Sequence, residues 1–215
     1  MWGSGGRTAA YAGTVDLRWA LVLPSYLLGT FPTAILVGRR TGQDPTREGS
    51  GNPGASNAYR TMGARAGALV LLGDLCKGAA TAGIGLAAGS RAVAVACGLA
   101  AVAGHVLPVT RRLRGGKGVA TAAGMTLVLL PIPAVVLAAL WAAVAKATGT
   151  ASVASITVAV GLPLAALASG RPVGEVVAFA ACATFVVARH RENIARLRRG
   201  EERPLESDRA GDSPR

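Results

Sequence analysis

Long runs without a charged residue constrain this chain more than any other feature. Trp19 to Gly38, Val119 to Ala145 and Ala147 to Gly170 are free of charge, and a helix of about 20 apolar residues crosses a bilayer core of ~30 Å. Of the 215 residues, 51% are hydrophobic and only 16% are charged, with a mean hydropathy of +0.43. Soluble domains of this length carry more charge. The pattern predicts an all-α, polytopic membrane protein.

Charges and prolines divide the chain into seven predicted transmembrane helices joined by short re-entrant or cytoplasmic loops. Pro131 and Pro133 split the 119–145 stretch into two short helices. Each half is short for a full crossing, so a five-span model with one kinked helix stays open, although it must lose a second crossing as well. The predicted spans cover about residues 18–38, 66–88, 92–109, 117–131, 133–147, 150–168 and 173–189.

The distribution of Lys and Arg predicts the orientation. In the seven-span arrangement, 18 of the 23 basic residues lie on one side and four on the other, and Lys77 lies within a span. Cytoplasmic loops carry the excess of Lys and Arg, so the rich side is cytoplasmic. We expect residues 1–17 to form an extracytoplasmic tail, 18–200 the membrane domain, and 201–215 a disordered, charged cytoplasmic tail.

The formal net charge of +12 indicates anionic partners. The basic residues stand between apolar runs, with no basic helix or aromatic stacking face, so nucleic acid is not expected. Anionic lipid headgroups and phosphorylated substrates fit the pattern better. The three cysteines, Cys76, Cys97 and Cys182, lie in apolar runs without metal-ligand spacing and are interpreted as small apolar residues.

The first of three polar segments runs from Gly49 to Arg60 and holds three glycines, two serines and two asparagines within nine residues. Successive backbone amides in such a loop can form an anion-binding concavity, and an arginine offers a bidentate fork for phosphate. An ordinary Gly/Asn turn would explain the glycines but not so many side-chain donors. The predicted phosphate-binding residues here are Asn52, Ser56, Asn57 and Arg60, with Ser50 as a further hydroxyl donor.

The second segment places Gly115, Gly116 and Lys117 directly before an uncharged helix that begins near Val119. A helix N-terminus preceded by glycines and a lysine is a sound phosphate site, and we predict that role for all three residues. The spacing is not that of a Walker loop. Three nearby arginines are interpreted as topogenic charges that bind lipid headgroups: Arg111, Arg112 and Arg114.

The third segment follows the last span and holds His190 and Asn193, one helical turn apart on the same face. Basic neighbours favour a neutral imidazole at His190, which could act as a hydrogen-bond partner or as a base. Within the spans, Asp74 and Lys77 are three residues apart. Isolated charges there are expensive, so they pair with each other or face the site. His105, at the end of a span, has the same two interpretations.

Several catalytic patterns are absent from the sequence. Neither histidine is followed by an acid five residues later, there is no Gly-x-Ser-x-Gly elbow, and Asp74 is the only aspartate within a span. Neither a metal site nor a cofactor is therefore predicted.

Together the segments resemble those of the bacterial membrane-integral acyl-phosphate glycerol-3-phosphate acyltransferases, the PlsY family, from the first span to Glu202. The matching motifs are Gly49-Ser50-Gly51-Asn52-Pro53-Gly54-Ala55-Ser56-Asn57 with Arg60, Gly104-His105-Val106-Leu107-Pro108 with Gly115-Gly116-Lys117-Gly118, Arg189-His190-Arg191-Glu192-Asn193, and Asp74 with Lys77-Gly78. Pro53 replaces an aliphatic residue, Ser56 replaces threonine, and Val109 to Leu113 replaces an aromatic-rich stretch.

The resemblance implies a seven-helix enzyme of the bacterial inner membrane, with its site and C-terminus cytoplasmic and its N-terminus outside. It implies transfer of a fatty acyl group from acyl phosphate to the 1-hydroxyl of glycerol 3-phosphate, as the first step of phospholipid synthesis. Ser50, His190 and Asn193 match catalytic residues, Gly115 and Gly116 match a glycerol-phosphate loop, and Glu202 matches a supporting acid. The expected partners are the two substrates and membrane lipid, and the expected state is a monomer.

The expected reaction needs little covalent help from the protein. Acyl phosphate carries a good leaving group, so the enzyme must hold two anions together and stabilise developing charge. The hydroxyl proton can pass to a substrate phosphate, whose second pKa is about 6, or to His190, and we favour the phosphate. Alternatives are a transporter of a phosphorylated metabolite, a lipid-binding scaffold and a related acyltransferase with another acceptor.

Overall fold

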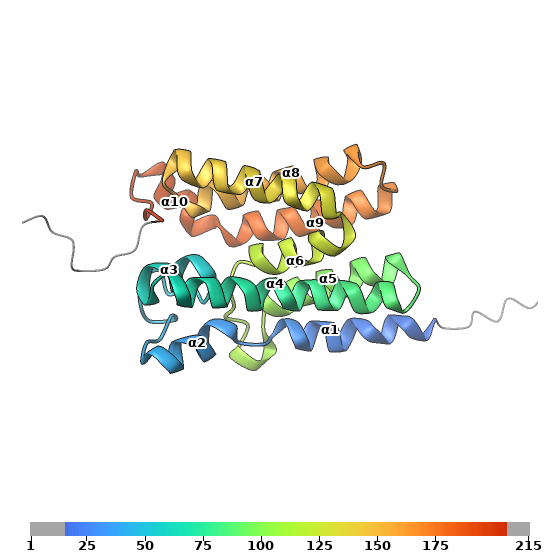
Figure 1. Cartoon of the computed structure of the whole chain (residues 1–215), viewed down its shortest axis with the longest axis horizontal. Coiled ribbons are helices and arrows are strands. Elements are labelled where there is room, and N and C mark those ends of the chain that lie inside the picture. The colour runs from blue at the N-terminus through green and yellow to red at the C-terminus, as the bar shows by residue number, and fades with distance from the viewer. Residues whose placement is uncertain (1–15, 206–215) are drawn as a thin grey trace, which may run out of the picture.

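The computed structural model describes residues 16–205, and over that range the chain folds into helices only (Figure 1). The all-α prediction is confirmed. Most of the two predicted tails, residues 1–15 and 206–215, lies outside the described residues. The helices are η1 (Leu17–Leu21), α1 (Val22–Gly29), α2 (Thr33–Thr41), α3 (Ala55–Met62), α4 (Ala64–Ala87), α5 (Arg91–Val106), η2 (Val109–Arg111), α6 (Val119–Leu129), α7 (Pro131–Thr148), α8 (Ala151–Ala168), α9 (Val173–Arg189) and α10 (Arg191–Arg198).

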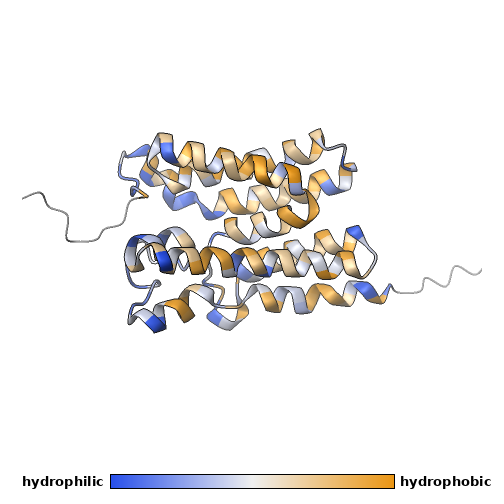
Figure 2. Ribbon diagram, viewed as in Figure 1, coloured by the Kyte–Doolittle hydropathy of each residue, from blue (hydrophilic) through white to orange (hydrophobic). Residues whose placement is uncertain are grey.

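Five helical stretches are long and apolar enough to cross a membrane, which confirms a multi-pass membrane protein. They are Leu17–Thr41, Ala64–Ala87, Arg91–Arg111, Pro131–Thr148 and Ala151–Ala168. The pair α9 and α10, bent by 55°, passes the same test as a sixth. Figure 2 shows apolar residues along the helices and polar residues at their ends and in the loops.

The predicted crossing at 117–131 is shorter in the structure. Helix α6 has 11 residues, which is about 16 Å at 1.5 Å per residue, half of the bilayer core. It ends before Pro131, where α7 begins, so the proline pair divides this stretch as predicted. Proline is well placed in the first turn of α7 because that turn needs no backbone donor. Seven full crossings stay a prediction.

The first predicted span, over about 18–38, lies within the apolar stretch Leu17–Thr41, but its helix is interrupted. Helix α1 ends at Gly29 and α2 begins at Thr33. Pro32 explains the break, because proline has no backbone N–H and disfavours helical geometry in the residue before it. The break leaves the carbonyl of Phe31 available to another element, and Lys77 Nζ lies 3.4 Å from it.

Small residues let the helices approach closely. Gly78 of α4 faces the Thr121 carbonyl of α6, and Gly124 of α6 faces the Leu75 carbonyl of α4. A Cβ at either glycine would overlap these backbones. Such contacts suit a bilayer, where apolar side chains gain little by leaving lipid and close packing drives association.

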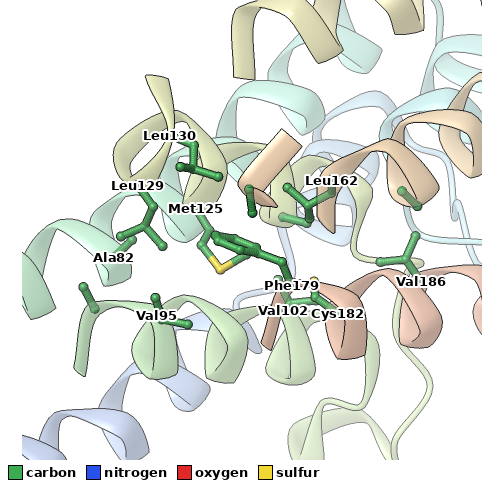
Figure 3. Packing of buried hydrophobic residues seen from close by; sticks show 14 of the residues in the cluster. Ala82, Val95, Val102, Met125, Leu129, Leu130, Leu162, Phe179, Cys182 and Val186 are labelled. Atoms are coloured by element: carbon green, nitrogen blue, oxygen red, sulfur yellow. The ribbon is translucent and has the colours of Figure 1, made fainter. Parts of the chain in front are cut away.

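The core lies where α5, α6, α8 and α9 meet, and Figure 3 shows it from close by. Met125 and Phe179 are fully buried at its centre, and Gly98 of α5 makes room for the Met125 side chain. By contrast, Ile132 on α7 is 77% exposed, as expected of a lipid-facing residue. The core holds α6 in place, and α6 starts at the second polar segment.

Candidate active site

Asn57 holds the first segment together. Its Nδ2 donates to the carbonyls of Pro45 (3.0 Å) and Glu48 (3.1 Å), and its Oδ1 accepts from the Ser50 backbone N–H (2.8 Å) and Oγ (3.0 Å). The side chain is buried. A carboxamide has two donor hydrogens and two acceptor lone pairs, so these bonds use its full capacity. The predicted role of Asn57 as a phosphate ligand stays a prediction, and the role that these bonds give it is to shape the loop.

Asn57→Ala tests this role. Removing four hydrogen bonds from a buried site should lower the free energy of unfolding by about 3 kcal/mol, at roughly 1 kcal/mol per bond that is not replaced. Thermal unfolding in detergent measures the effect. Asn52→Ala is the matched control, since Asn52 is only half-buried in the same loop. Equal melting temperatures for the two variants would contradict the assignment.

Three other predicted donors of this segment, Ser50, Asn52 and Ser56, are half-buried. Ser50 is oriented by its bonds to Asn57, and Ser56 stands in the first turn of α3 behind the N-cap Gly54. Asn52 donates its backbone N–H to Ser50 Oγ at 3.4 Å. The segment thus brings two hydroxyls and an amide side chain to one short loop, and their phosphate-binding and catalytic roles stay predictions.

Arg60 connects this segment to the end of the chain. It lies on α3, is 8% exposed, and donates from Nη1 to the Pro204 carbonyl at 3.1 Å. In Figure 1, α3 and α10 lie at the same end of the bundle. The chain after α10 also contacts the turn between α7 and α8, where the Leu205 N–H donates a hydrogen bond to the Gly149 carbonyl at 2.7 Å.

A chain of hydrogen bonds joins the second and third segments. Lys117 Nζ donates to Asn193 Oδ1, Asn193 Nδ2 donates to Glu202 Oε1 at 2.7 Å, and Arg196 Nε donates to Glu202 Oε2 at 3.0 Å. Asn193 is buried, and the Glu202 side chain is 6% exposed. Asn193 links Glu202 to the lysine, and the supporting role of Glu202 stays a prediction.

The positive charges in this cluster would be stabilised by a bound anion. The pKa of Lys117 is lowered to about 8, mainly by burial; the charge of Glu202 raises this pKa, and the charges of Arg196 and Arg60 lower it. Like charges near a partly buried ammonium disfavour its charged form. A phosphate arriving beside Lys117, Arg60 and Arg196 would reverse that penalty.

His190 stands in the turn between α9 and α10. Its side chain is buried, and its Nδ1 lies 2.8 Å from the Val186 carbonyl. Burial is the main reason that its pKa falls to about 4, and the charge of Lys117 adds to the effect. The neutral imidazole predicted from the basic neighbours fits this position. With Nδ1–H donated to the carbonyl, Nε2 is left as an acceptor.

The glycine turn of the second segment is packed into the bundle. Gly115 and Gly116 are buried against the end of α5, and the Gly116 N–H donates to the His105 carbonyl at 3.1 Å. Gly118 has a φ of +86°, a left-handed conformation that favours glycine. Tyr26 anchors the start of this loop, donating from Oη to the Leu107 carbonyl at 2.7 Å.

Asp74 and Lys77 form the predicted ion pair. Lys77 Nζ lies 2.9 Å from Asp74 Oδ1 and 2.7 Å from His105 Nδ1. All three side chains are buried, and the contact between Lys77 and His105 joins α4 to α5 inside the bundle. Of the two interpretations, the pairing is confirmed, and a site-facing role for these residues stays open.

Two contributors were missed by the sequence analysis. Arg196 lies three residues after Asn193 on α10, and that helical spacing could have identified it. Tyr26 lies in an apolar run, and nothing in the sequence links it to a loop 81 residues away.

Over residues 16–205, no three side chains of His, Cys, Asp or Glu gather where they could hold a metal ion.

An apolar groove of about 790 Å³ opens between α2, α3 and α4. Leu36 and Leu69 line it, Tyr59 contributes from α3, and Arg40 and Arg65 are the basic residues of its lining. Apolar walls with two arginines suit a ligand that is part hydrocarbon and part anion.

The sequence matches a known family of proteins over most of its length. The family model described as "Glycerol-3-phosphate acyltransferase" matches residues 19–200. The chain belongs to the glycerol-3-phosphate acyltransferase family. The described cluster around Lys117 therefore lies in a protein of that family, and Glu202 lies two residues beyond the matched range.

Curated relatives of this acyltransferase family cover most of the chain. The glycerol-3-phosphate acyltransferase of Syntrophomonas wolfei is 45% identical over 184 residues, which is 85% of this chain and 94% of the relative. That of Rubrobacter xylanophilus is 46% identical over 188 residues, or 87% and 94%.

Two solved structures of a glycerol 3-phosphate acyltransferase have a fold similar to that of this chain. The crystal structure of PlsY, an integral membrane glycerol 3-phosphate acyltransferase, in its glycerol 3-phosphate form has a TM-score of 0.83 and 34% sequence identity. It covers 87% of this chain and 94% of its own. The lysophosphatidic acid form of the same protein has a TM-score of 0.81.

Proposed function

We propose that the protein is a membrane-integral acyltransferase that moves a fatty acyl group from acyl phosphate to the 1-hydroxyl of glycerol 3-phosphate. The hydroxyl oxygen forms a new bond to the acyl carbon, and the bond from that carbon to the phosphate oxygen breaks. The hydroxyl proton leaves, and the products are lysophosphatidate and inorganic phosphate. This is the first acylation of phospholipid synthesis.

One observation carries the proposal: Lys117, Asn193 and Glu202 form a continuous hydrogen-bonded chain beside Arg60, at one end of an apolar bundle. Two anionic substrates repel each other, and bringing them together needs fixed positive charge in a site of low dielectric. Lys117 and Arg60 supply that charge, and Asn193 with Glu202 orients the lysine. Ser50 lies on the loop that Asn57 shapes, and we assign it a catalytic contact to the reacting groups.

The proton passes to a substrate phosphate. A phosphate with a second pKa of about 6 accepts a proton near neutral pH, and the attacking hydroxyl must lie close to it. His190 has an acceptor at Nε2 but is held in place by the Val186 carbonyl, so we assign it an orienting role. His190→Ala should keep measurable turnover. A loss of several orders of magnitude with substrate binding intact would instead make His190 the base.

The groove between α2, α3 and α4 suits the donor. Its apolar walls would hold the acyl chain, and Arg40 and Arg65 would meet the anionic end. Lysophosphatidate, which is also a single-chain anion, would fit the same groove.

The decisive assay combines purified protein in lipid nanodiscs, palmitoyl phosphate and glycerol 3-phosphate. We expect phosphate release that requires both substrates, and lysophosphatidate as the product. Ser50→Ala should abolish it. Well-folded protein that gives no turnover would direct the search to other donors and acceptors, and then to transport.

The pH dependence follows from Lys117. The protonated form is the one that binds phosphate, and its pKa is near 8. Acceptor kcat/KM should therefore fall tenfold per pH unit above about pH 8, because that parameter reports the free enzyme. Lys117→Arg should remove this limb of the profile, since arginine stays protonated. The same limb in both proteins would assign it to another group.

The interior of the helix bundle does not favour the alternative that the protein is a transporter. The charged groups within the spans, Asp74 and Lys77, pair with each other and with His105. They are buried, so they line no open path.

We further propose that the cluster faces the cytoplasm of the bacterial inner membrane, with the N-terminus outside and the protein monomeric. The excess of Lys and Arg on that side supports the orientation. In a Cys76→Ser background, an impermeant thiol reagent should label Pro172→Cys in intact cells but spare Gln43→Cys. The two remaining native cysteines are buried. The opposite labelling pattern would invert the assignment.

A further inference from the structure

The buried trio of Asp74, Lys77 and His105 is larger than a simple ion pair requires. The Lys77 ammonium has three donor hydrogens, and three acceptors surround it: Asp74 Oδ1 at 2.9 Å, His105 Nδ1 at 2.7 Å and the Phe31 carbonyl at 3.4 Å. One lysine thus joins α4, α5 and the break between α1 and α2. Its donors are used within the protein.

This arrangement fixes the orientation of the His105 ring. Its Nδ1 lies 2.7 Å from Lys77 Nζ and 3.5 Å from Asp74 Oδ1, and a protonated lysine donates to that nitrogen. Nε2 then faces the glycine turn of the second segment, because a Cβ built on Gly116 would overlap that atom.

The reason for glycine at position 116 is space and not backbone conformation. Gly118 has a left-handed φ, whereas Gly116 does not. The Gly116 N–H is bonded to the His105 carbonyl and its Cα lies against the His105 ring. Gly115 likewise packs on the carbonyls of His105 and Val106. The turn therefore rests on His105 through both backbone and side chain.

We propose that Asp74, Lys77 and His105 are positioning residues for the acceptor. They act through Gly116 and hold the turn that precedes Lys117 at the depth where the lysine meets the phosphate of glycerol 3-phosphate. This inference rests on the proposed function. It assigns the trio no contact with substrate, and it makes the acceptor, not the acyl donor, sensitive to these residues.

The first test is a charge-neutral change. Asp74→Asn with Lys77→Met removes the ion pair without leaving a buried charge unpaired, which single changes would do. The KM for glycerol 3-phosphate should rise about tenfold, since displacement of a binding group by ~1 Å can reduce the rate up to about a hundredfold. The KM for acyl phosphate should not change. Equal changes in both values, or none, would overturn the proposal.

The matched control uses another interhelical ion pair that also involves α5. Arg91, at the opposite end of that helix from His105, pairs with Glu175 of α9 at 2.7 Å. Arg91→Gln with Glu175→Gln should leave the ratio of the two KM values unchanged. If it raises acceptor KM as well, general loosening of the bundle explains the effect and positioning does not.

The second test needs no turnover, so it separates this inference from the proposed function. Gly116→Ala should lower the melting temperature by about 4 °C, because the new methyl overlaps the imidazole. In the His105→Ala background the same change should have little effect, a non-additivity that a double-mutant cycle measures. Additive effects would show that the ring does not support the turn. Inactive wild-type protein with a coupled cycle would refute the function alone.

Discussion

Lys117→Met should reduce kcat/KM for glycerol 3-phosphate by about a thousandfold, the upper range for loss of one preorganised charge donor. Methionine keeps the length and apolar stem of lysine but carries no charge. Asn193 orients the ammonium. Burial and the positive charges of Arg60 and Arg196 disfavour the protonated form of Lys117 until an anion binds beside it. Steady-state phosphate release at pH 7 measures the effect.

The matched control for Lys117 is Arg114→Gln in the same loop. Arg114 is exposed, and the sequence analysis interprets it as a charge for lipid headgroups. Its loss should leave kcat/KM near the wild-type value in nanodiscs of fixed lipid composition. If both variants lose activity equally, the loop acts by its total charge, and the specific role of Lys117 fails.

Asn193→Leu should lower turnover about a hundredfold and the free energy of unfolding by about 2 kcal/mol. Leucine branches at the same carbon as asparagine and is larger, but it has no polar side-chain atoms. The change leaves Lys117 Nζ and Glu202 Oε1 without their shared partner in a buried place, and an unsatisfied buried group costs about 1–3 kcal/mol. Turnover and thermal unfolding in the same detergent give the two numbers.

The distinguishing readout is the pH profile. Without Asn193 the lysine is no longer tied to the carboxylate of Glu202, so the position of its titration should change as well as the rate. Arg198→Gln, an exposed change on the same helix, is the control and should alter neither activity nor stability. Wild-type kinetics in Asn193→Leu would end the proposal that this bridge orients Lys117.

Much of the architecture could be predicted from local sequence. Apolar runs of bilayer length predict helices whatever they pack against, and Pro131 ends one helix and starts the next. The same rule applied to Pro32 would have found the break between α1 and α2, which the span analysis overlooked. The polar segments were found because glycine, asparagine and basic residues are unusual beside lipid.

The roles within those segments could be predicted only in part. Composition treats Asn52 and Asn57 alike, yet the fold encloses one and leaves the other half-buried. Both glycines of the turn were assigned to phosphate, but the contact of Gly116 with His105 depends on where α5 ends relative to α6. No pattern along the chain reports such a distance.

By itself the sequence determined that this protein is a helical membrane protein with two glycine-rich basic segments and a third basic segment typical of the acyltransferase family, because those properties are local. Only the tertiary structure decided that Lys117, Asn193 and Glu202 form one bonded chain, that Arg60 meets the carbonyl of Pro204, and that His105 supports Gly116. Hydrogen bonds and close contacts act over a few ångströms, and the partners here are up to 144 residues apart. Which of them meet is set by the packing of the helices.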